Sequence, residues 1–147
     1  MHLVAAVNLR DCGNVGAIAR TATAFGFDAV LTVGTTPPLS RKEAHKVALD
    51  GKTIPTTHFT DLAAALTAYP DHYVVALETS GTPLPNWQPP SNVPLLILLG
   101  SERFGLSSSE INVAKSVVSI PHNTTTVASL NVAAAFAIAA YTVSMVH

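Results

Sequence analysis

The sequence has little charge. Asp, Glu, Lys and Arg make up only 12% of its 147 residues, and the formal net charge is −1. Domains that bind nucleic acid over a broad surface are usually strongly basic, so a nucleic-acid partner would have to be held by a local basic patch. Hydrophobic residues make up 48% of the chain, which predicts that most helices and strands are buried on more than one face.

Cysteine and long apolar runs are also scarce. The single cysteine, Cys12, excludes an internal disulfide. The first residues show no basic region followed by an apolar run, so we expect no secretory signal. Residues 132–146 are apolar and Ala-rich, but a bilayer span needs roughly 20 residues. We therefore expect a cytoplasmic protein with no membrane partner. The histidines lack the spacing of a metal site, so no metal is expected.

What the sequence does contain is an alternation of short apolar runs and helix-like segments. This alternation predicts one α/β domain, over residues 1–147, with a mainly parallel sheet. The expected strands are residues 2–7, 29–33, 56–59, 73–78, 94–99 and 117–120. The expected helices are residues 15–25, a segment capped by Ser40, and residues 61–69, 107–115 and 129–146. Residues 81–94 contain five prolines and are expected to form a loop.

Polar residues cluster at three places where a predicted strand ends. These places are residues 14–20, 100–106 and 120–131. In sheets of this kind, ligands bind at the carboxyl ends of the strands, so the three segments together suggest one composite site. Gly100 would let a ligand approach the backbone closely.

Each place also has a simpler explanation when taken alone. Asn14 could cap the first helix and Ser129 the last one. Arg20 could be a solvated helix residue, and Glu102 could be a carboxylate favoured by the dipole of the next helix. The segment after the first strand lacks the G-x-G-x-x-G fingerprint, and Gly100 to Gly105 is not a P-loop. A flavodoxin-like phosphate or nucleotide binder fits this segment poorly.

The three motifs in their order are more specific than any one of them. Asn-x-Gly-Ala-Ile-x-Arg (14–20), Gly-Ser-Glu-x-x-Gly-Leu (100–106), and Ile-Pro with Ser-Leu-Asn-Val-Ala (120–133) follow one another along almost the whole chain. This combination resembles the SpoU (TrmH-type) branch of the SPOUT methyltransferases. The resemblance implies methyl transfer from S-adenosylmethionine to a ribose 2′-hydroxyl of RNA. It also implies a C-terminal deep trefoil knot and a homodimer with the site at the subunit interface.

The resemblance carries over to individual residues. The catalytic residues it implies are Arg20, Asn14, Glu102, Ser129 and Asn131. The residues it implies for binding S-adenosylmethionine are Leu77, Glu78, Gly100, Ile120, Ser129 and Leu130. The family's Arg is described as activating the hydroxyl, but a guanidinium stays protonated in proteins. Stabilisation of negative charge on the ribose oxygen is therefore the role favoured here for Arg20.

The resemblance also bears on the RNA substrate. Small single-domain relatives lean toward tRNA, so tRNA is favoured over rRNA, and no added N-terminal RNA-binding domain is expected.

The sequence leaves alternatives for other residues and for the function. The basic cluster of Arg41, Lys42, His45 and Lys46 could face RNA or be a solvated helix face. Trp87 could stack on a base or simply cover the core within its loop. A catalytically inert RNA-binding or regulatory module on the same scaffold is the alternative function.

Overall fold

The computed structural model describes residues 1–47 and 52–146, with side chains from residue 45 to 47 left aside. The predicted basic cluster therefore lies partly outside the described residues, because the structure does not describe the side chains of His45 and Lys46. The strands are β1 (Leu3–Val7), β2 (Ala29–Val33), β3 (Thr56–Phe59), β4 (Tyr73–Pro83), β5 (Leu95–Leu99) and β6 (Ser116–Ser119). The helices are α1 (Cys12–Ala24), α2 (Arg41–Val47), α3 (Leu62–Ala68), α4 (Ser108–Asn112) and α5 (Val132–Ser144), with a short 3₁₀ helix at Leu84–Asn86.

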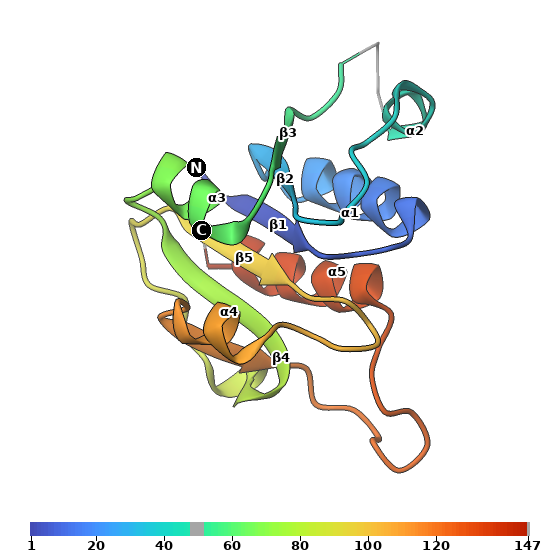
Figure 1. Cartoon of the computed structure of the whole chain (residues 1–147). Coiled ribbons are helices and arrows are strands. Elements are labelled where there is room, and N and C mark those ends of the chain that lie inside the picture. Colours follow the sequence, from blue (N-terminus) through green and yellow to red (C-terminus); the bar gives the residue numbers. More distant parts are fainter. Residues whose placement is uncertain (48–51, 147) are drawn as a thin grey trace.

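In the described part of the chain the six strands form one sheet in the order β3-β2-β1-β5-β4-β6. Each pair of neighbouring strands runs parallel. The predicted α/β fold with a mainly parallel sheet is confirmed. After β1 the chain moves outward through β2 and β3, and it then returns on the other side of β1 (Figure 1). The carboxyl ends of β1 and β5 thus flank a topological switch point, where such sheets bind ligands.

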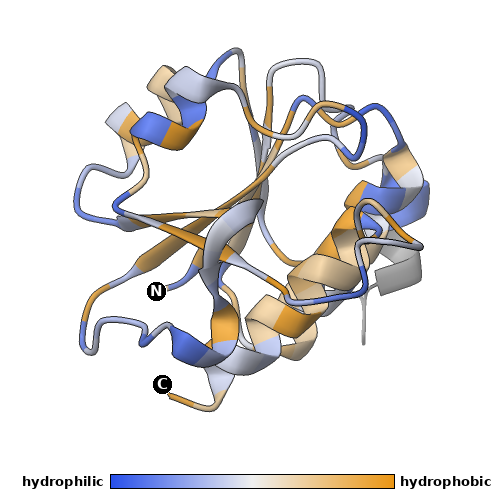
Figure 2. Ribbon diagram, turned by 90° about the horizontal axis from the view of Figure 1, so that it is seen from below, coloured by the Kyte–Doolittle hydropathy of each residue, from blue (hydrophilic) through white to orange (hydrophobic). Residues whose placement is uncertain are grey.

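The helices cover both faces of the sheet. Alternate residues of β1 point to opposite faces: Val4 and Ala6 pack with α1 and α5, whereas Leu3 and Ala5 pack with α3. Figure 2 shows the apolar strands in the middle of the molecule, with helices on two sides. Within the described residues, no helix is long and apolar enough to cross a membrane.

The expected end of β4 was wrong. Instead of ending near Glu78, β4 continues to Pro83 across an irregularity in its pairing with β6. The extension depends on close approach at Gly81, where an added Cβ would lie 2.6 Å from backbone atoms of Val117 and Val118. The hydroxyl of Ser119 also donates to the Gly81 carbonyl at 2.8 Å. The proline-containing loop therefore begins later than predicted, after Pro83.

Two expected helix caps were also wrong. The first helix begins at Cys12 and is capped by Asp11, whose carboxylate accepts from the Gly13 N–H at 2.8 Å. Asn14 therefore lies inside the first turn and is free for other contacts. The last helix is capped by Asn131 and not by Ser129. Asn and Asp stabilise the N-cap position about as well as Ser does. The sequence alone therefore could not show which residue caps the helix.

Asn131 should contribute measurably to stability through this cap. Its side-chain oxygen accepts from the N–H groups of Ala133 and Ala134, at 3.0 and 3.2 Å. We expect Asn131→Ala to lower the free energy of unfolding by at least about 1 kcal/mol, because the variant loses this cap and also the hydrogen bonds that the amide donates to Glu102 and Asn14. The loss is measured by urea denaturation at fixed protein concentration. Ser129→Ala is the matched control, and we expect it to change this free energy by less than about 0.5 kcal/mol. An equal loss in both variants would contradict the assignment of the cap.

Candidate active site

Three side chains from distant parts of the chain meet at the carboxyl ends of β1 and β5. One carboxylate oxygen of Glu102, Oε1, accepts from the side-chain amides of Asn14 at 3.1 Å and Asn131 at 2.9 Å. The Asn131 amide also donates to the side-chain oxygen of Asn14 at 3.1 Å. The backbone N–H of Val132 donates to the same Glu102 oxygen at 3.3 Å. We call Asn14, Glu102 and Asn131 the polar triangle.

The polar triangle joins the beginnings of two helices. Asn14 lies in the first turn of α1, and Asn131 caps α5. Carboxylates are favoured near helix N-termini, because the unpaired N–H groups there carry partial positive charge. Glu102 therefore helps to hold the beginnings of α1 and α5 together at one point.

A cavity of about 270 Å³ lies on one side of this arrangement. Its walls come from the ends of β4, β5 and β6 and from the segment that leads into α5. The described residues that line it include all six predicted for cofactor binding: Leu77, Glu78, Gly100, Ile120, Ser129 and Leu130. We call this space the first cavity.

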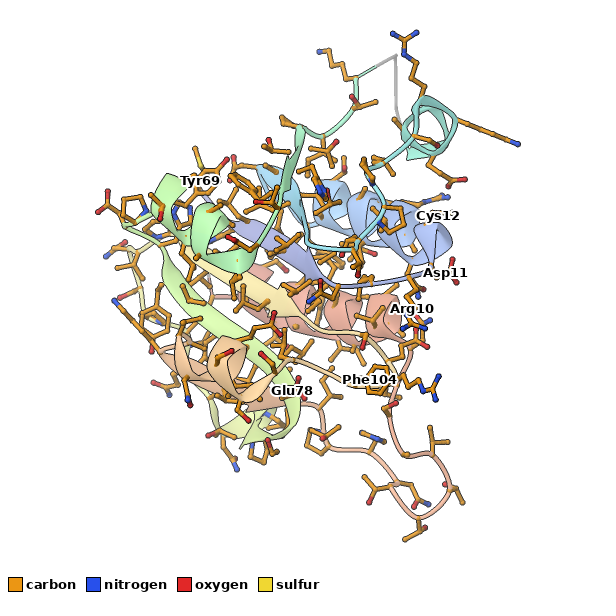
Figure 3. The ribbon with its side chains drawn as sticks, in the orientation of Figure 1. Arg10, Asp11, Cys12, Tyr69, Glu78 and Phe104 are labelled. Carbon is orange, nitrogen blue, oxygen red and sulfur yellow. The ribbon has the colours of Figure 1, made fainter. Side chains whose placement is uncertain are left out.

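A second cavity, of about 440 Å³, lies at the carboxyl ends of β1 and β5. Asn8, Arg10 and Asn14 contribute to its walls. Residues 101–105 and Val132 line both cavities, so the two spaces share a wall. Figure 3 shows Arg10, Asp11 and Phe104 on the side of the molecule where β1 and β5 end.

The shared wall is a tight turn fixed by its own hydrogen bonds. The Gly105 N–H donates to the Ser101 carbonyl at 2.7 Å, and the Leu106 N–H donates to the carboxylate of Glu78 at 2.5 Å. Gly105 has φ +64, and an added Cβ would lie 2.8 Å from that carboxylate. At Gly100 an added Cβ would lie 2.5 Å from the backbone of Gly105 and Leu106. Both positions therefore require glycine, and Glu78 anchors the turn.

Arg20 is separated from this cluster in a single chain. It is exposed and, among the described residues, it lines neither cavity. The six-residue spacing from Asn14 explains this, because six residues advance about 9 Å along a helix and turn the side chain to another face. Arg20 lies in the third turn of α1, since the helix begins at Cys12. Its catalytic role stays a prediction.

Two residues that the structure places at the site, Asn8 and His122, had no role predicted from the sequence. Asn8 follows β1 directly, adopts φ 55, and accepts from the Thr35 N–H at 3.1 Å. Asn tolerates a positive φ better than most residues, so an Asn directly after a strand was the sequence signal that could have drawn attention to this position. His122 lines the first cavity, and its Nδ1 is hydrogen-bonded to the Ile120 carbonyl at 2.8 Å. The carbonyl can only accept, so Nδ1 carries the proton and a neutral ring keeps a lone pair on Nε2.

The Nε2 atom of His122 is buried and has no hydrogen-bond partner among the described residues. A buried acceptor without a partner is costly, and a ligand donor in the first cavity would satisfy it. Trp87, by contrast, packs partly buried against the apolar core. The structure therefore favours the prediction that Trp87 covers the core.

Comparison with known proteins agrees with this geometry. The model of the SpoU rRNA Methylase family matches residues 1–141. No curated protein matches the sequence. An rRNA methyltransferase from Sinorhizobium meliloti, solved with AdoMet bound, is 29% identical, with a TM-score of 0.78 over 96% of this chain and 54% of that one. The SpoU methyltransferase AviRb from Streptomyces viridochromogenes has a TM-score of 0.81 at 22% identity, which shows a shared fold alone, over 99% of this chain and 59% of that one.

A third solved structure, which concerns 2-OH methylation of C/U34 on tRNA, is 26% identical with a TM-score of 0.80. That match covers 96% of this chain and 92% of the other. The first two solved chains are longer, so this chain spans just over half of their length. The resemblance inferred from the three motifs is confirmed, because the family model extends over nearly the whole sequence. The chain belongs to the SpoU rRNA methylase family.

Proposed function

We propose that this protein transfers a methyl group from S-adenosylmethionine to a ribose 2′-hydroxyl of RNA. The observation that carries the proposal is the position of the first cavity, which holds all six predicted donor-binding residues and shares Glu102 with the polar triangle. The AdoMet complex of the Sinorhizobium meliloti relative and the tRNA 2-OH methylation described for another relative support it.

The first cavity has the chemistry that an adenosyl ligand requires. Leu77, Leu99 and Ile120 supply apolar surface, and Gly100 leaves backbone accessible. The free lone pair of His122 Nε2 offers an acceptor to an amino or hydroxyl group. Largely apolar pockets with a few placed polar groups are typical of small-molecule sites. S-adenosylmethionine, when bound, supplies a methyl group already activated by the sulfonium.

Glu102 acts as a positioning residue in this proposal. Its Oε1 already accepts three N–H groups, from Asn14, Asn131 and Val132, so this oxygen is engaged in holding the structure together. The polar triangle instead fixes the distance between the wall of the first cavity and Asn14, which borders the second cavity. The alignment of two reactants in this way accounts for a large part of many enzymatic rate enhancements.

Arg20 acts in this proposal on the charge that develops as the ribose hydroxyl loses its proton. A guanidinium stays protonated and can stabilise an alkoxide oxygen electrostatically. Because Arg20 lies outside both cavities of its own chain, we infer that it serves the site across a homodimer interface. Its place on α1, which packs against α5, is consistent with this arrangement.

The acceptor RNA is proposed to bind over the second cavity. Arg10 and Arg103 line that cavity and can contact phosphate despite the net charge of −1. The relative whose structure concerns 2-OH methylation of C/U34 on tRNA matches this chain over almost the whole of both proteins. This match supports tRNA as the favoured substrate, with rRNA as the second choice.

Arg20→Ala should separate methyl transfer from donor binding. We expect transfer from labelled S-adenosylmethionine to unfractionated tRNA to fall at least about 100-fold, as on loss of one charge-stabilising group. The dissociation constant for S-adenosylmethionine, from isothermal titration, should stay within twofold. The control is Lys115→Ala, because Lys115 lies at the amino end of β6, away from the carboxyl ends of the strands, and lines neither cavity.

Equal losses of binding and transfer in Arg20→Ala would contradict its catalytic role. Failure of the wild-type protein to bind S-adenosylmethionine would overturn the proposed enzyme. RNA binding without donor binding would favour the catalytically inert RNA-binding module instead.

We also propose that the protein is a homodimer. One face of α5 packs in the core through Ala133, Phe136 and Ala140. Another face exposes an apolar stripe at helical spacing, with Ile138 44%, Tyr141 55% and Met145 69% exposed. Such a stripe on a helix that already has a buried face is typical of a protein–protein contact.

Ile138→Glu should dissociate this dimer. A carboxylate in an apolar interface would be buried without a partner, so we expect sedimentation velocity to show a monomer at micromolar concentration. Methyl transfer should fall with it, whereas folding measured by circular dichroism should be retained. The matched control is Val113→Glu, at an apolar side chain of similar exposure, 43%, just beyond α4. A dimer that survives Ile138→Glu unchanged would contradict this interface.

We propose, finally, that the segment after β6 is threaded as a deep trefoil knot. β6 lies at one edge of the sheet, whereas α5 packs against α1 beneath β1 and β5. Residues 120–131 therefore cross the carboxyl ends of β4 and β5, where the 100–106 segment also passes (Figure 1). Pulling on both termini with optical tweezers should give an extended length shorter than the full contour, because a tightened knot retains residues. Recovery of the full contour length would contradict the knot.

A further inference from the structure

Phe104 is the most exposed large aromatic side chain described in the structure, at 70%. It lies in the shared wall and contributes to both cavities. Single exposed apolar residues are common on protein surfaces, so exposure alone does not indicate a binding role. The position of Phe104 at the mouth of the second cavity, together with its support and its neighbours, distinguishes it.

The backbone beneath Phe104 is held firmly. Its N–H donates to the hydroxyl of Ser101 at 3.1 Å, and the next residue, Gly105, donates to the Ser101 carbonyl at 2.7 Å. Glu78 anchors the end of the turn through the Leu106 N–H. A ring carried on an ordered turn loses little conformational freedom when a ligand binds to it.

Cations accompany the ring. The guanidinium of Arg103 lies 5.1 Å from the centre of the Phe104 ring, and Arg10 lines the same cavity. An exposed aromatic face beside guanidinium groups suits a nucleotide, because the base can stack on the ring while a phosphate meets a cation. Trp87, by contrast, packs against the core.

We propose that Phe104 is a stacking platform for a nucleobase of the acceptor RNA at the mouth of the second cavity. The inference rests on the proposed function, because it assumes that the second cavity receives RNA. Stacking on a ring accepts every base, since every base has a π face. Phe104 therefore supplies affinity and alignment of the nucleotide, and it does not select the base.

Three variants test the platform: Phe104→Ala, Phe104→Leu and Phe104→Tyr. Binding of unfractionated tRNA is measured by fluorescence anisotropy, and methyl transfer is measured as kcat and KM for tRNA. We expect Phe104→Ala to raise both Kd and KM about tenfold. Phe104→Leu should resemble Phe104→Ala, because it keeps apolar bulk without the π face. Phe104→Tyr should stay within about twofold of the wild type. Because Phe104 also lines the first cavity, binding of S-adenosylmethionine is titrated for each variant, and a loss of donor binding as large as the loss of RNA binding would overturn the platform.

Several results would overturn the platform. These are unchanged RNA binding in Phe104→Ala, wild-type binding in Phe104→Leu, or a monomer in Phe104→Ala by sedimentation, which would make Phe104 a subunit contact. Absence of RNA binding by the wild-type protein would overturn the platform and the proposed function together. RNA binding without methyl transfer would overturn only the proposed enzyme, and the anisotropy series would still decide the role of Phe104.

Discussion

A single carboxylate oxygen organises this site. Oε1 of Glu102 receives N–H groups from a residue 88 positions earlier and from two residues 29 and 30 positions later in the chain. None of these contacts is local, so they can form only after the sheet has placed β1 and β5 side by side. The beginnings of α1 and α5 are then fixed against the turn after β5. Both cavities take their shape from that arrangement.

Two of the carboxylates that line the cavities, Glu102 and Glu78, have different structural roles. Glu102 joins the helix beginnings, whereas Glu78 accepts from the Leu106 N–H and anchors the turn that separates the cavities. The sequence contains few charged residues, and the structure uses these two to position backbone and amides. The guanidinium groups of Arg10 and Arg103 remain exposed at the second cavity. Two of the eight basic residues are thus available to a polyanion at this cavity, beside the carboxylates of Asp11, Glu102 and Glu110.

The sequence predicted the layers well because the strands are short apolar runs that the sheet buries on both faces. The six residues that the family resemblance implies for binding S-adenosylmethionine all line the first cavity, and their role in binding stays a prediction. Prediction from the sequence was less successful where tertiary contacts decide. The length of β4 depends on close approach at Gly81, and the cap of α5 depends on competition between Ser129 and Asn131. Neither can be read from local composition.

The largest difference concerns Arg20. The motif places it six residues from Asn14, but the periodicity of a helix turns these side chains to different faces. Phe104 and His122 were not predicted as site residues. A short sequence motif does not show that the side chain of Phe104 is exposed, or that Nε2 of His122 lacks a hydrogen-bond partner among the described residues. Their significance emerges only from the surrounding cavity.

The shared turn of residues 101–105 has a thermodynamic consequence. It forms part of both cavities, so any displacement of the turn by an occupant of one cavity alters the other. Free-energy coupling between two ligands is necessarily reciprocal. If a ligand in one cavity raises the affinity of the other cavity for its ligand, the second ligand raises the affinity for the first by the same factor.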